Sequence, residues 1–369
     1  AMVTTELSRW PNQLFGFRSV LESRAAGHRR MCLTSPTGTG KSVLLCDLIE
    51  DDVANGRKVV VYSNRKLLIE QLSKVLSKSG INHGLRAADH EPDFTKSVQI
   101  SSIQTEASRV IKRETWDLHD ADSVYVDEVH LQASGTAVEL QKRHLEKSGS
   151  TFVGLTATPL DIASVCDHLI VAGTKKEGRE CGSLVYARHR GIDEPDMRRY
   201  KPNTKTGEYK ENDVVRAIMT PNVFGRVHEH WKAANPDGRP TILFGPDVKG
   251  SVWFAEQFRA AGVRASHIDG ENCWVDGEMY PSNREVRDQI LSEVRKGDIQ
   301  VLCNRFVLRE GIDLPELEFM ILATVVGSLQ SYLQMTGRIL RSCPATQKKE
   351  SMILDHGGNW HRHGSANVD

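Results

Sequence analysis

The chain has 369 residues, which is longer than a domain with a single hydrophobic core usually is, so two domains are expected. Hydrophobic residues make up 39% of the chain, enough to form sizeable cores. Lys plus Arg and Asp plus Glu number 48 each, and this balance excludes a uniformly basic surface; a groove for nucleic acid must be a local concentration of positive charge. The seven cysteines form no CxxC pair and no apolar run reaches the roughly 20 residues of a membrane span. "AMVTTELSRW" has no signal-peptide core, so a cytoplasmic protein with reduced thiols is expected.

Short apolar runs alternate with helical patterns over the first 172 residues. The runs "MCLT", "KVVVYS", "VQIS", "SVYVDE", "TFVGLTAT" and "HLIVAG" predict buried strands. The stretches "SVLLCDLIEDDV" and "KLLIEQLSKVLSKSG" predict helices, and Gly80 ends the second one. Strands that alternate with helices indicate a parallel sheet with helices on both faces.

This pattern stops near residue 173 and resumes near residue 223. Residues 173–222 are polar, charged and turn-rich, which predicts a connecting segment in which "SLVYAR" is a candidate strand. The second series predicts strands at "TILFGP", "ASHID", "IQVLCN", "FMILAT" and "SMILDH", with helices at "SVWFAEQFRAAG", "NREVRDQILSEVRKG" and "SLQSYLQMTGRILRS". We therefore expect an α/β fold with domains at 1–172 and 223–369.

The stretch "SPTGTGKS" (35–42) lies between the first predicted strand and the first of these helices. Glycines let backbone N–H groups turn inward around phosphates, and the positive end of the following helix adds to the attraction. Lys41 is expected to reach the β- and γ-phosphates and Ser42 to bind Mg²⁺. The predicted phosphate-binding set is Thr37, Gly38, Thr39, Gly40, Lys41 and Ser42. The alternative is an ordinary glycine-rich turn, and the loop by itself indicates no more than a nucleotide phosphate.

Carboxylates follow a later strand in "SVYVDEVH" (123–130). Functional groups of parallel sheets gather at the carboxyl ends of the strands, so Asp127 is expected near the phosphate loop, where it would hold Mg²⁺. Glu128 is the natural base for an attacking water, which favours hydrolysis over phosphate transfer. His130, with Thr156 and Thr158 of "GLTATP", is expected to relay the phosphate state. The alternative for each is a polar strand end.

Two stretches of the second half carry further candidates. In "QMTGRILR" the residues Gln334, Arg338 and Arg341 are spaced i, i+4 and i+7, so on a helix they share one face and the arginines are candidate arginine fingers. A solvated basic face is the alternative. In "LREGIDLP", Gly311 and Asp313 follow a strand and are expected to face the nucleotide.

Eight stretches, in this order, resemble the motifs of superfamily 2 helicases and translocases of the DEAD/DEAH-like group. They are "SPTGTGKS", "YSNRKLL", "SSIQT", "VDEVH", "LTATP", "TILFG", "LREGIDLP" and "QMTGRILR", and the likeness runs from about Gln13 to Arg341. "SYLQMTGRILR" and "ILDHGGNWHRHG" look most like bacterial RadD-type DNA repair helicases, relatives of the XPB branch. The chain departs from the family pattern at Ser35, where glycine is usual, and at Cys303, where threonine is usual.

The resemblance implies two tandem RecA-like domains and an ATP-dependent DNA helicase or translocase that uses Mg²⁺. It further implies that Gln13 in "RWPNQ" reads adenine, and that a single strand of DNA, free or at a fork, crosses both domains. The candidate contacts to that strand are Arg65, Lys66, Gln104, Thr105, Asn304 and Arg305. Such contacts go to phosphates and sugars, so binding should tolerate sequence and weaken with salt.

Two other functions stay open: an RNA helicase, and an ATP-driven subunit of a repair, restriction or defence complex that clamps or moves DNA without unwinding it. In "GENCWVDGEMYPSN", Trp274 and Tyr280 are candidates for stacking on bases, although packing against their own domain is favoured. The basic clusters "ARHR" (187–190) and "HRH" (361–363) are expected to be solvated surface.

Overall fold

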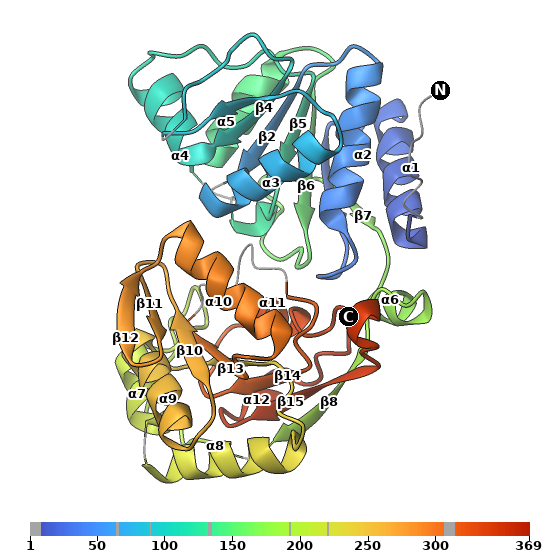
Figure 1. Cartoon of the computed structure of the whole chain (residues 1–369). Helices are drawn as coiled ribbons and strands as arrows, with labels where there is room; N and C mark the ends of the chain where they lie inside the picture. Colours follow the sequence, from blue (N-terminus) through green and yellow to red (C-terminus); the bar gives the residue numbers. More distant parts are fainter. Residues whose placement is uncertain are drawn as a thin grey trace. The chain divides into compact units, whose positions relative to one another are not determined.

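The computed structural model describes residues 9–63, 66–88, 90–131, 135–191, 193–219, 221–305 and 314–369. Its internal contacts divide the chain into two compact units, Ala1–Cys181 and Gly182–Asp369, which are described separately below. Both units combine a sheet with helices, as Figure 1 shows.

The first unit contains a seven-stranded sheet in which every pair of neighbours is parallel. Its strands are β1 (Arg30–Thr34), β2 (Val59–Ser63), β3 (Gly84–Arg86), β4 (Val98–Ser102), β5 (Ser123–Val126), β6 (Thr151–Thr156) and β7 (His168–Val171), in the spatial order β3-β4-β2-β5-β6-β1-β7. The six strands predicted for this half are all present. β3, with three residues, is too short to give a periodic signal.

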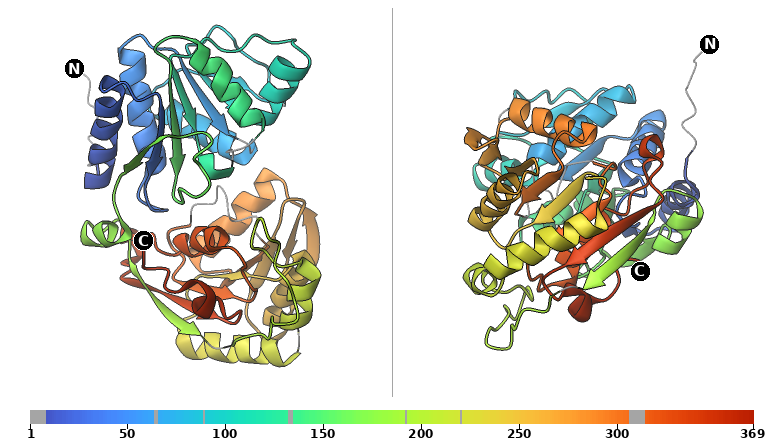
Figure 2. Two further views of the ribbon diagram at one scale, coloured as in Figure 1. Left: turned by 180° about the vertical axis from the view of Figure 1, so that it is seen from behind. Right: turned by 60° about the horizontal axis from the view of Figure 1, so that its bottom comes forward.

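Helices cover both faces of this sheet. The described helices are α1 (Pro11–Ala25), α2 (Lys41–Ala54), α3 (Lys66–Lys78), α4 (Ile103–Glu106), the π-helix η1 (Ala107–Lys112), the 3₁₀-helix η2 (Val129–Leu131), α5 (Thr136–Glu146) and α6 (Lys175–Glu180). Because side chains alternate along a strand, Val59 and Val61 of β2 join the core under α1, α2 and α3, whereas Val60 joins the core under α5. Figure 2, from behind, shows the face that carries α5.

The second unit contains an eight-stranded sheet in which two of the seven neighbouring pairs are antiparallel and the others are parallel. Its strands are β8 (Tyr186–Gly191), β9 (Thr241–Phe244), β10 (Ala265–Ile268), β11 (Asn272–Val275), β12 (Glu278–Pro281), β13 (Val301–Asn304), β14 (Phe319–Leu322) and β15 (Glu350–Asp355), in the order β12-β11-β10-β13-β9-β14-β15-β8. The described helices are α7 (Glu211–Ile218), α8 (Pro221–Ala234), α9 (Val248–Ala260), α10 (Arg284–Lys296), α11 (Leu329–Gly337), η4 (Pro344–Thr346) and α12 (Asn359–His363). The α/β class with mostly parallel sheets is confirmed in both halves.

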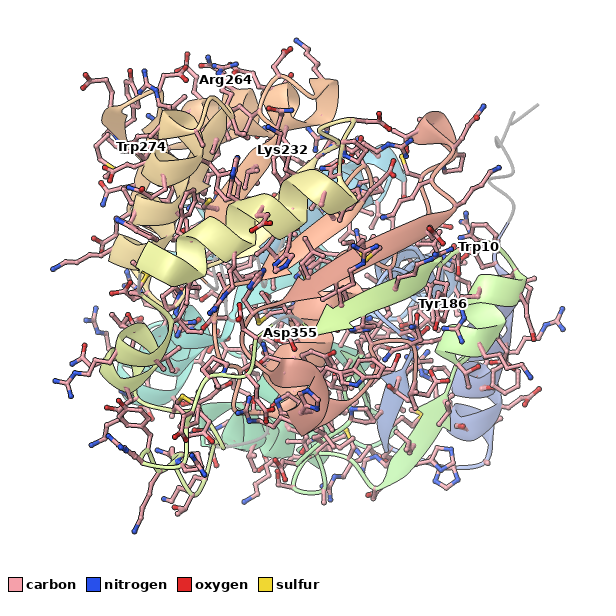
Figure 3. All side chains as sticks on the ribbon, turned by 90° about the horizontal axis from the view of Figure 1, so that it is seen from below. Trp10, Tyr186, Lys232, Arg264, Trp274 and Asp355 are labelled. Atoms are coloured by element: carbon pink, nitrogen blue, oxygen red, sulfur yellow. The ribbon has the colours of Figure 1, made fainter. Side chains whose placement is uncertain are left out.

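The stretch between β10 and α10 is a β-hairpin rather than a loop. β11 and β12 pair antiparallel, and the turn residues Asp276 and Gly277 both have positive φ, as a two-residue hairpin turn requires. Trp274, labelled in Figure 3, is buried in the core of its own unit, as the sequence favoured, whereas Tyr280 is exposed.

The segment 173–222 contributes to the second sheet. Its candidate strand is β8, which pairs with β15 along six residues and forms one edge of that sheet. The same segment also contains α6 and α7. The sequence did not show which strand β8 pairs with, since β8 and β15 are more than 150 residues apart along the chain.

Candidate nucleotide-binding and hydrolysis site

Three neighbouring strands of the first sheet end at the same edge. The strands β5, β6 and β1 lie side by side and run parallel, so the residues that follow them share that edge. The phosphate-loop stretch follows β1, Asp127 follows β5, and Thr156 closes β6. The topology therefore brings together the three motifs that the sequence assigned to phosphate chemistry.

The stretch 35–42 folds as a loop closed on itself at the start of α2. Gly38 and Gly40 have φ of +92° and +81°, a region that residues with a Cβ rarely adopt. The Ser35 and Thr39 hydroxyls are 2.5 Å apart across the loop. The Nζ atom of Lys41 donates to the Ser35 carbonyl at 3.0 Å, which folds this cation back over the loop. Ser42 is exposed in the first turn of α2.

Helix α1 holds this loop from the side. The Gln13 side chain is 4% exposed; its amide nitrogen donates to the Gly40 carbonyl at 3.2 Å and to the Thr39 carbonyl at 3.4 Å. Its oxygen accepts from the Trp10 N–H at 2.8 Å. A Cβ at position 40 would lie 2.1 Å from the Gln13 nitrogen, so this contact requires glycine. The expected reading of adenine by Gln13 stays a prediction; its described role is to position the loop.

Asn12 is a second residue of α1 at this loop, and sequence reasoning missed it. Its amide nitrogen donates to the Thr39 carbonyl at 3.1 Å, and its amide oxygen is buried with no hydrogen-bond partner in the described structure. The signal available in the sequence was its place in "RWPNQ", beside Gln13.

The two carboxylates after β5 occupy an unusual stretch of backbone. Glu128 has a φ of +49°, a region that is costly for a residue with a side chain and that is found often at functional sites. The Asp127 side chain accepts from the Glu128 N–H at 3.0 Å. Burial and the neighbouring Glu128 raise the pKa of Asp127, and the Lys41 ammonium opposes that rise. A carboxylate in this setting is stabilised in its ionised form by a nearby cation, which fits a Mg²⁺ ligand.

A buried chain of polar groups connects this turn to the end of β6. The Nδ1 atom of His130 lies 2.6 Å from the Thr156 hydroxyl and 3.4 Å from a Glu128 carboxylate oxygen. The Thr156 hydroxyl also accepts from the Thr158 N–H at 3.0 Å. Thr156 is fully buried, and the buried Thr158 hydroxyl has no hydrogen-bond partner in the described structure. The three predicted relay residues thus lie in one contiguous network.

The predicted arginine residues of the second unit do not share one helical face. Helix α11 carries Gln334 but ends at Gly337, and Arg338 caps it with helical φ and ψ. The chain then turns, and Arg341 forms an antiparallel bridge with Leu184. The prediction of one helix through residue 342 was therefore wrong, since local pairing with the segment before β8 replaces the last helical turn.

Side chains from distant segments fix the start of α11. Glu208 accepts from the Gly327 N–H at 3.0 Å and from the Ser328 hydroxyl at 2.9 Å. The fully buried Asn359, in "DHGGN", accepts from the Val326 N–H at 2.7 Å. These residues were not predicted as part of the site, because the sequence does not show that they meet the helix with the "QMTGRILR" stretch.

Four residues of the first unit were predicted to contact a nucleic-acid strand. Arg65 lies outside the described residues, and Lys66 begins α3. Gln104 and Thr105 lie in α4, which follows β4 at the same edge of the sheet as the phosphate loop. Gln104 accepts from the Ser102 hydroxyl at 3.0 Å, and Thr105 is buried. A contact between these residues and nucleic acid stays a prediction.

Of the candidates after β13, Gly311 and Asp313 lie outside the described residues. Asn304 is fully buried, and its amide nitrogen donates to the Leu243 carbonyl at 3.1 Å, so it supports the neighbouring strand. Arg305 donates to the Gly245 carbonyl at 3.5 Å. Their contacts with nucleic acid also stay predictions. In the described part of the chain, no helix has the length and apolar character needed to cross a bilayer.

Comparison with known proteins places both halves of the chain in known families. Residues 7–161 match the family described as type III restriction enzyme, res subunit, and residues 226–343 match the helicase conserved C-terminal domain. A 51.5 kDa protein of a Lactococcus phage (isolate 7-9) is 27% identical over 344 residues, which are 90% of this chain and 66% of that protein. The protein of Halobacterium salinarum named for a DNA 3′-5′ helicase, Rad25, is 24% identical over 335 residues, which are 88% and 51% of the two chains.

The fold is similar to that of a fragment of an HsdR subunit of a type I restriction enzyme from Vibrio vulnificus YJ016. The TM-score is 0.72 at 18% identity, over 97% of this chain and 66% of that one. The chain therefore spans between about half and two thirds of the length of these relatives. The similarity to the Rad25 protein agrees with the expected relation of this chain to the XPB branch of superfamily 2 helicases.

Proposed function

This chain belongs to helicase superfamily 2, and within that family we propose that it is an ATP-driven motor that moves along or unwinds DNA. The observation that carries the proposal is the shared sheet edge, at which the phosphate loop, the Asp127–Glu128 turn and the Thr156 network come together. Binding of ATP, its hydrolysis and a relay of its state each need one of these three parts.

The phosphate loop is proposed to bind the phosphates of ATP. Its glycines at positive φ let backbone N–H groups face an anion, and the positive end of α2 adds to the attraction. Lys41 would exchange the Ser35 carbonyl for phosphate oxygens. When bound, Mg²⁺ would neutralise charge on the β- and γ-phosphates, with Ser42 and Asp127 as the residues placed to hold it.

Glu128 is proposed to orient and deprotonate the attacking water. One of its oxygens accepts no hydrogen bond in the described structure and lies 3.4 Å from the Nδ1 atom of His130, so it can accept a hydrogen bond from the attacking water. Its strained backbone fixes where that oxygen points. His130, on the same turn, would then sense the change at Glu128 and pass it through the Thr156 hydroxyl to residues 157–158.

From the second unit, Arg338 and Arg341 are proposed to stabilise negative charge that develops on the γ-phosphate, with Gln334 orienting the water or the phosphate. The support is their place in a motif-like stretch and the careful positioning of α11 by Glu208 and Asn359. Hydrolysis would then be coupled to relative movement of the two units.

DNA is proposed as the track because the Halobacterium relative is named for a DNA helicase activity. A second candidate function has specific support, since the first half matches the res subunit family and the fold is similar to that of an HsdR subunit. In that case the chain would be the ATP-driven part of a restriction-like complex and would move DNA without separating its strands.

The decisive experiment is ATP hydrolysis by the purified chain alone and with single-stranded DNA, duplex DNA or RNA. Lys41→Ala provides the blank. Glu128→Gln should lower turnover about 10²- to 10⁴-fold while ATP still binds, because the variant keeps the shape of the side chain and removes the base. A rate that depends on Lys41 but is unchanged by any nucleic acid would sink the motor proposal. RNA stimulation in place of DNA stimulation would reassign the track.

Strand separation distinguishes the two candidates. On a forked duplex with one labelled strand, a helicase releases that strand in the presence of ATP, whereas a translocating subunit hydrolyses ATP without release. Displacement of a bound protein block from the same duplex would then show movement.

A further inference from the structure

Two basic clusters that are about 170 residues apart in the sequence meet on the second unit. Arg188, His189 and Arg190 lie on the edge strand β8, and His361–His363 lie on α12, which contacts β8. Both clusters were expected to be solvated surface, and their arginines and His361 are exposed. The first cluster also borders an open cavity of about 500 Å³, which is lined by Tyr186, Arg188, His189, Gly191 and Trp360.

The walls of this cavity are aromatic and accessible. The Tyr186 side chain, labelled on β8 in Figure 3, is 54% exposed, and the Trp360 side chain is 38% exposed. The rings of Trp360 and His189 are 4.6 Å apart, so they pack against each other and form one wall. Nothing lies within 4 Å of where a Cβ at Gly191 would stand, which leaves that side open. Exposed planar rings such as those of Tyr186 and Trp360 suit stacking on a nucleobase.

Positive charge borders these rings. Arg188 is exposed and pairs with Glu350 at 2.8 Å, while Arg190 and Arg362 are also exposed. The Arg362 guanidinium lies 5.6 Å from the centre of the Tyr209 ring. An exposed ion pair such as Arg188–Glu350 contributes little to stability, so a phosphate can replace the carboxylate at small cost.

His189 adds an uncharged ring to the wall. Burial lowers its pKa to about 4, so the ring is neutral at pH 7. Its Nε2 atom accepts from the Ala366 N–H at 3.1 Å, which puts the ring proton on Nδ1. Nδ1 is buried and has no partner in the described structure. The ring therefore contributes a neutral stacking surface to the wall, and the positive charge comes from the arginines.

An extended peptide is a less suitable occupant, although β8 is an edge strand. The Asn367 side chain already donates to the Ala187 carbonyl at 2.8 Å and accepts from the Ala187 N–H at 2.9 Å. It therefore occupies the backbone groups that an added strand would need in the middle of β8.

We propose that this cavity binds a base and its flanking phosphate from single-stranded nucleic acid, with stacking on Tyr186 and Trp360 and charge from Arg188. The site lies outside the motifs that resemble the family's strand contacts, and it would hold a strand without regard to sequence. It rests on the proposed function in that the same strand would be the track of the motor.

The test is binding of a fluorescein-labelled dT20 strand to the full chain, followed by anisotropy without ATP. Tyr186→Ala and Trp360→Ala should each raise Kd about 5- to 100-fold, the range for loss of one base–aromatic stack, whereas Trp360→Phe should stay within about threefold. Arg188→Ala should weaken binding and reduce its dependence on salt. Phe94→Ala, at an exposed aromatic residue of the first unit, is the matched control.

A direct readout accompanies the binding curves. Strands that carry 5-iododeoxyuridine are cross-linked by light, and the modified peptides are identified; adducts at Tyr186 or Trp360 support the site. Unchanged Kd in both alanine variants, or an equal loss in Phe94→Ala, would each overturn the proposal. These readouts need no hydrolysis, so they remain informative if DNA fails to stimulate the ATPase. If DNA stimulates hydrolysis but the alanine variants keep the parent Kd, the motor proposal stands and the cavity proposal fails.

Discussion

Replacing Gly40 by alanine should weaken ATP binding without unfolding the first unit. Gly40 precedes α2 with a φ of +81°, and a Cβ there would lie 2.1 Å from the Gln13 amide nitrogen. The variant must therefore adopt an unfavourable backbone conformation and also displace the Gln13 side chain from the loop.

The magnitude follows from these two costs. A left-handed backbone costs a residue with a side chain about 1–2 kcal/mol. Displacing Gln13 removes its bonds to the Thr39 and Gly40 carbonyls, each worth about 0.5–1.5 kcal/mol. The observed loop conformation is thus disfavoured by about 2–5 kcal/mol. If ATP binds that conformation, Kd should rise about 30- to 4,000-fold, at 1.4 kcal/mol per factor of ten.

The assay is calorimetric titration with a non-hydrolysable ATP analogue, with Tm recorded for each variant. Gly27→Ala is the matched control: its φ of +91° carries the same backbone cost, but nothing lies within 4 Å of the new Cβ. It should lower stability slightly and leave Kd unchanged. The double variant Gln13→Ala/Gly40→Ala should bind no more weakly than Gly40→Ala, because the contact that Gln13 makes is lost in both.

Two results would refute this reasoning. One is a Kd of Gly40→Ala within twofold of the parent, which would mean that the loop binds nucleotide in another conformation. The other is strict additivity in the double variant, which would mean that Gln13 and the loop act independently.

Thr156→Val removes a buried hydroxyl that is hydrogen-bonded to His130, so it should destabilise the first unit by about 1–3 kcal/mol. It should also lower the DNA-stimulated ATPase rate more than the unstimulated rate, and an unchanged ratio of the two rates would argue against a relay through Thr156. Asp52→Ala should lower the free energy of unfolding, measured by urea denaturation, by about 3–5 kcal/mol, because it leaves the buried Arg24 charge without its partner at 2.9 Å. The double variant Arg24→Met/Asp52→Leu should lose far less stability, and equal losses in the two variants would contradict this account. Burial lowers the pKa of Lys348 from 10.5 to about 8, so between pH 8 and 10.5 the unfolded chain binds more protons than the folded chain, and the free energy of unfolding should rise with pH. Lys348→Met should flatten this rise. An unchanged slope in the variant would show that another group causes the pH dependence.

Much of the first unit follows from local patterns in the sequence. Runs such as "KVVVYS" and "TFVGLTAT" are apolar over a strand's length, and they lie between helical stretches, so they could become little else than buried strands. Glycine at positions 38 and 40 before Lys41 predicted the loop, because these backbone conformations exclude other residues. Motif order then made the family recognisable.

The helix boundary after Gly337 shows where local patterns fail. The periodicity of "SYLQMTGRILR" favours a longer helix, but pairing of Arg341 with Leu184 ends it, and Leu184 is more than 150 residues earlier. The candidate strand in "SLVYAR" corresponds to β8, but its pairing with β15 was not predicted, since a strand's own residues do not show which strand it pairs with.

By itself, the sequence determined the α/β class, the phosphate loop and the acidic turn, because each depends on the conformational preferences of a few consecutive residues. The tertiary structure alone decided the strand order that joins those motifs at one edge, the grip of Asn12 and Gln13 on the loop, and the cavity between β8 and α12. Each of these depends on contacts between residues far apart in the chain, and such contacts are selected by packing of the whole unit rather than by any local pattern.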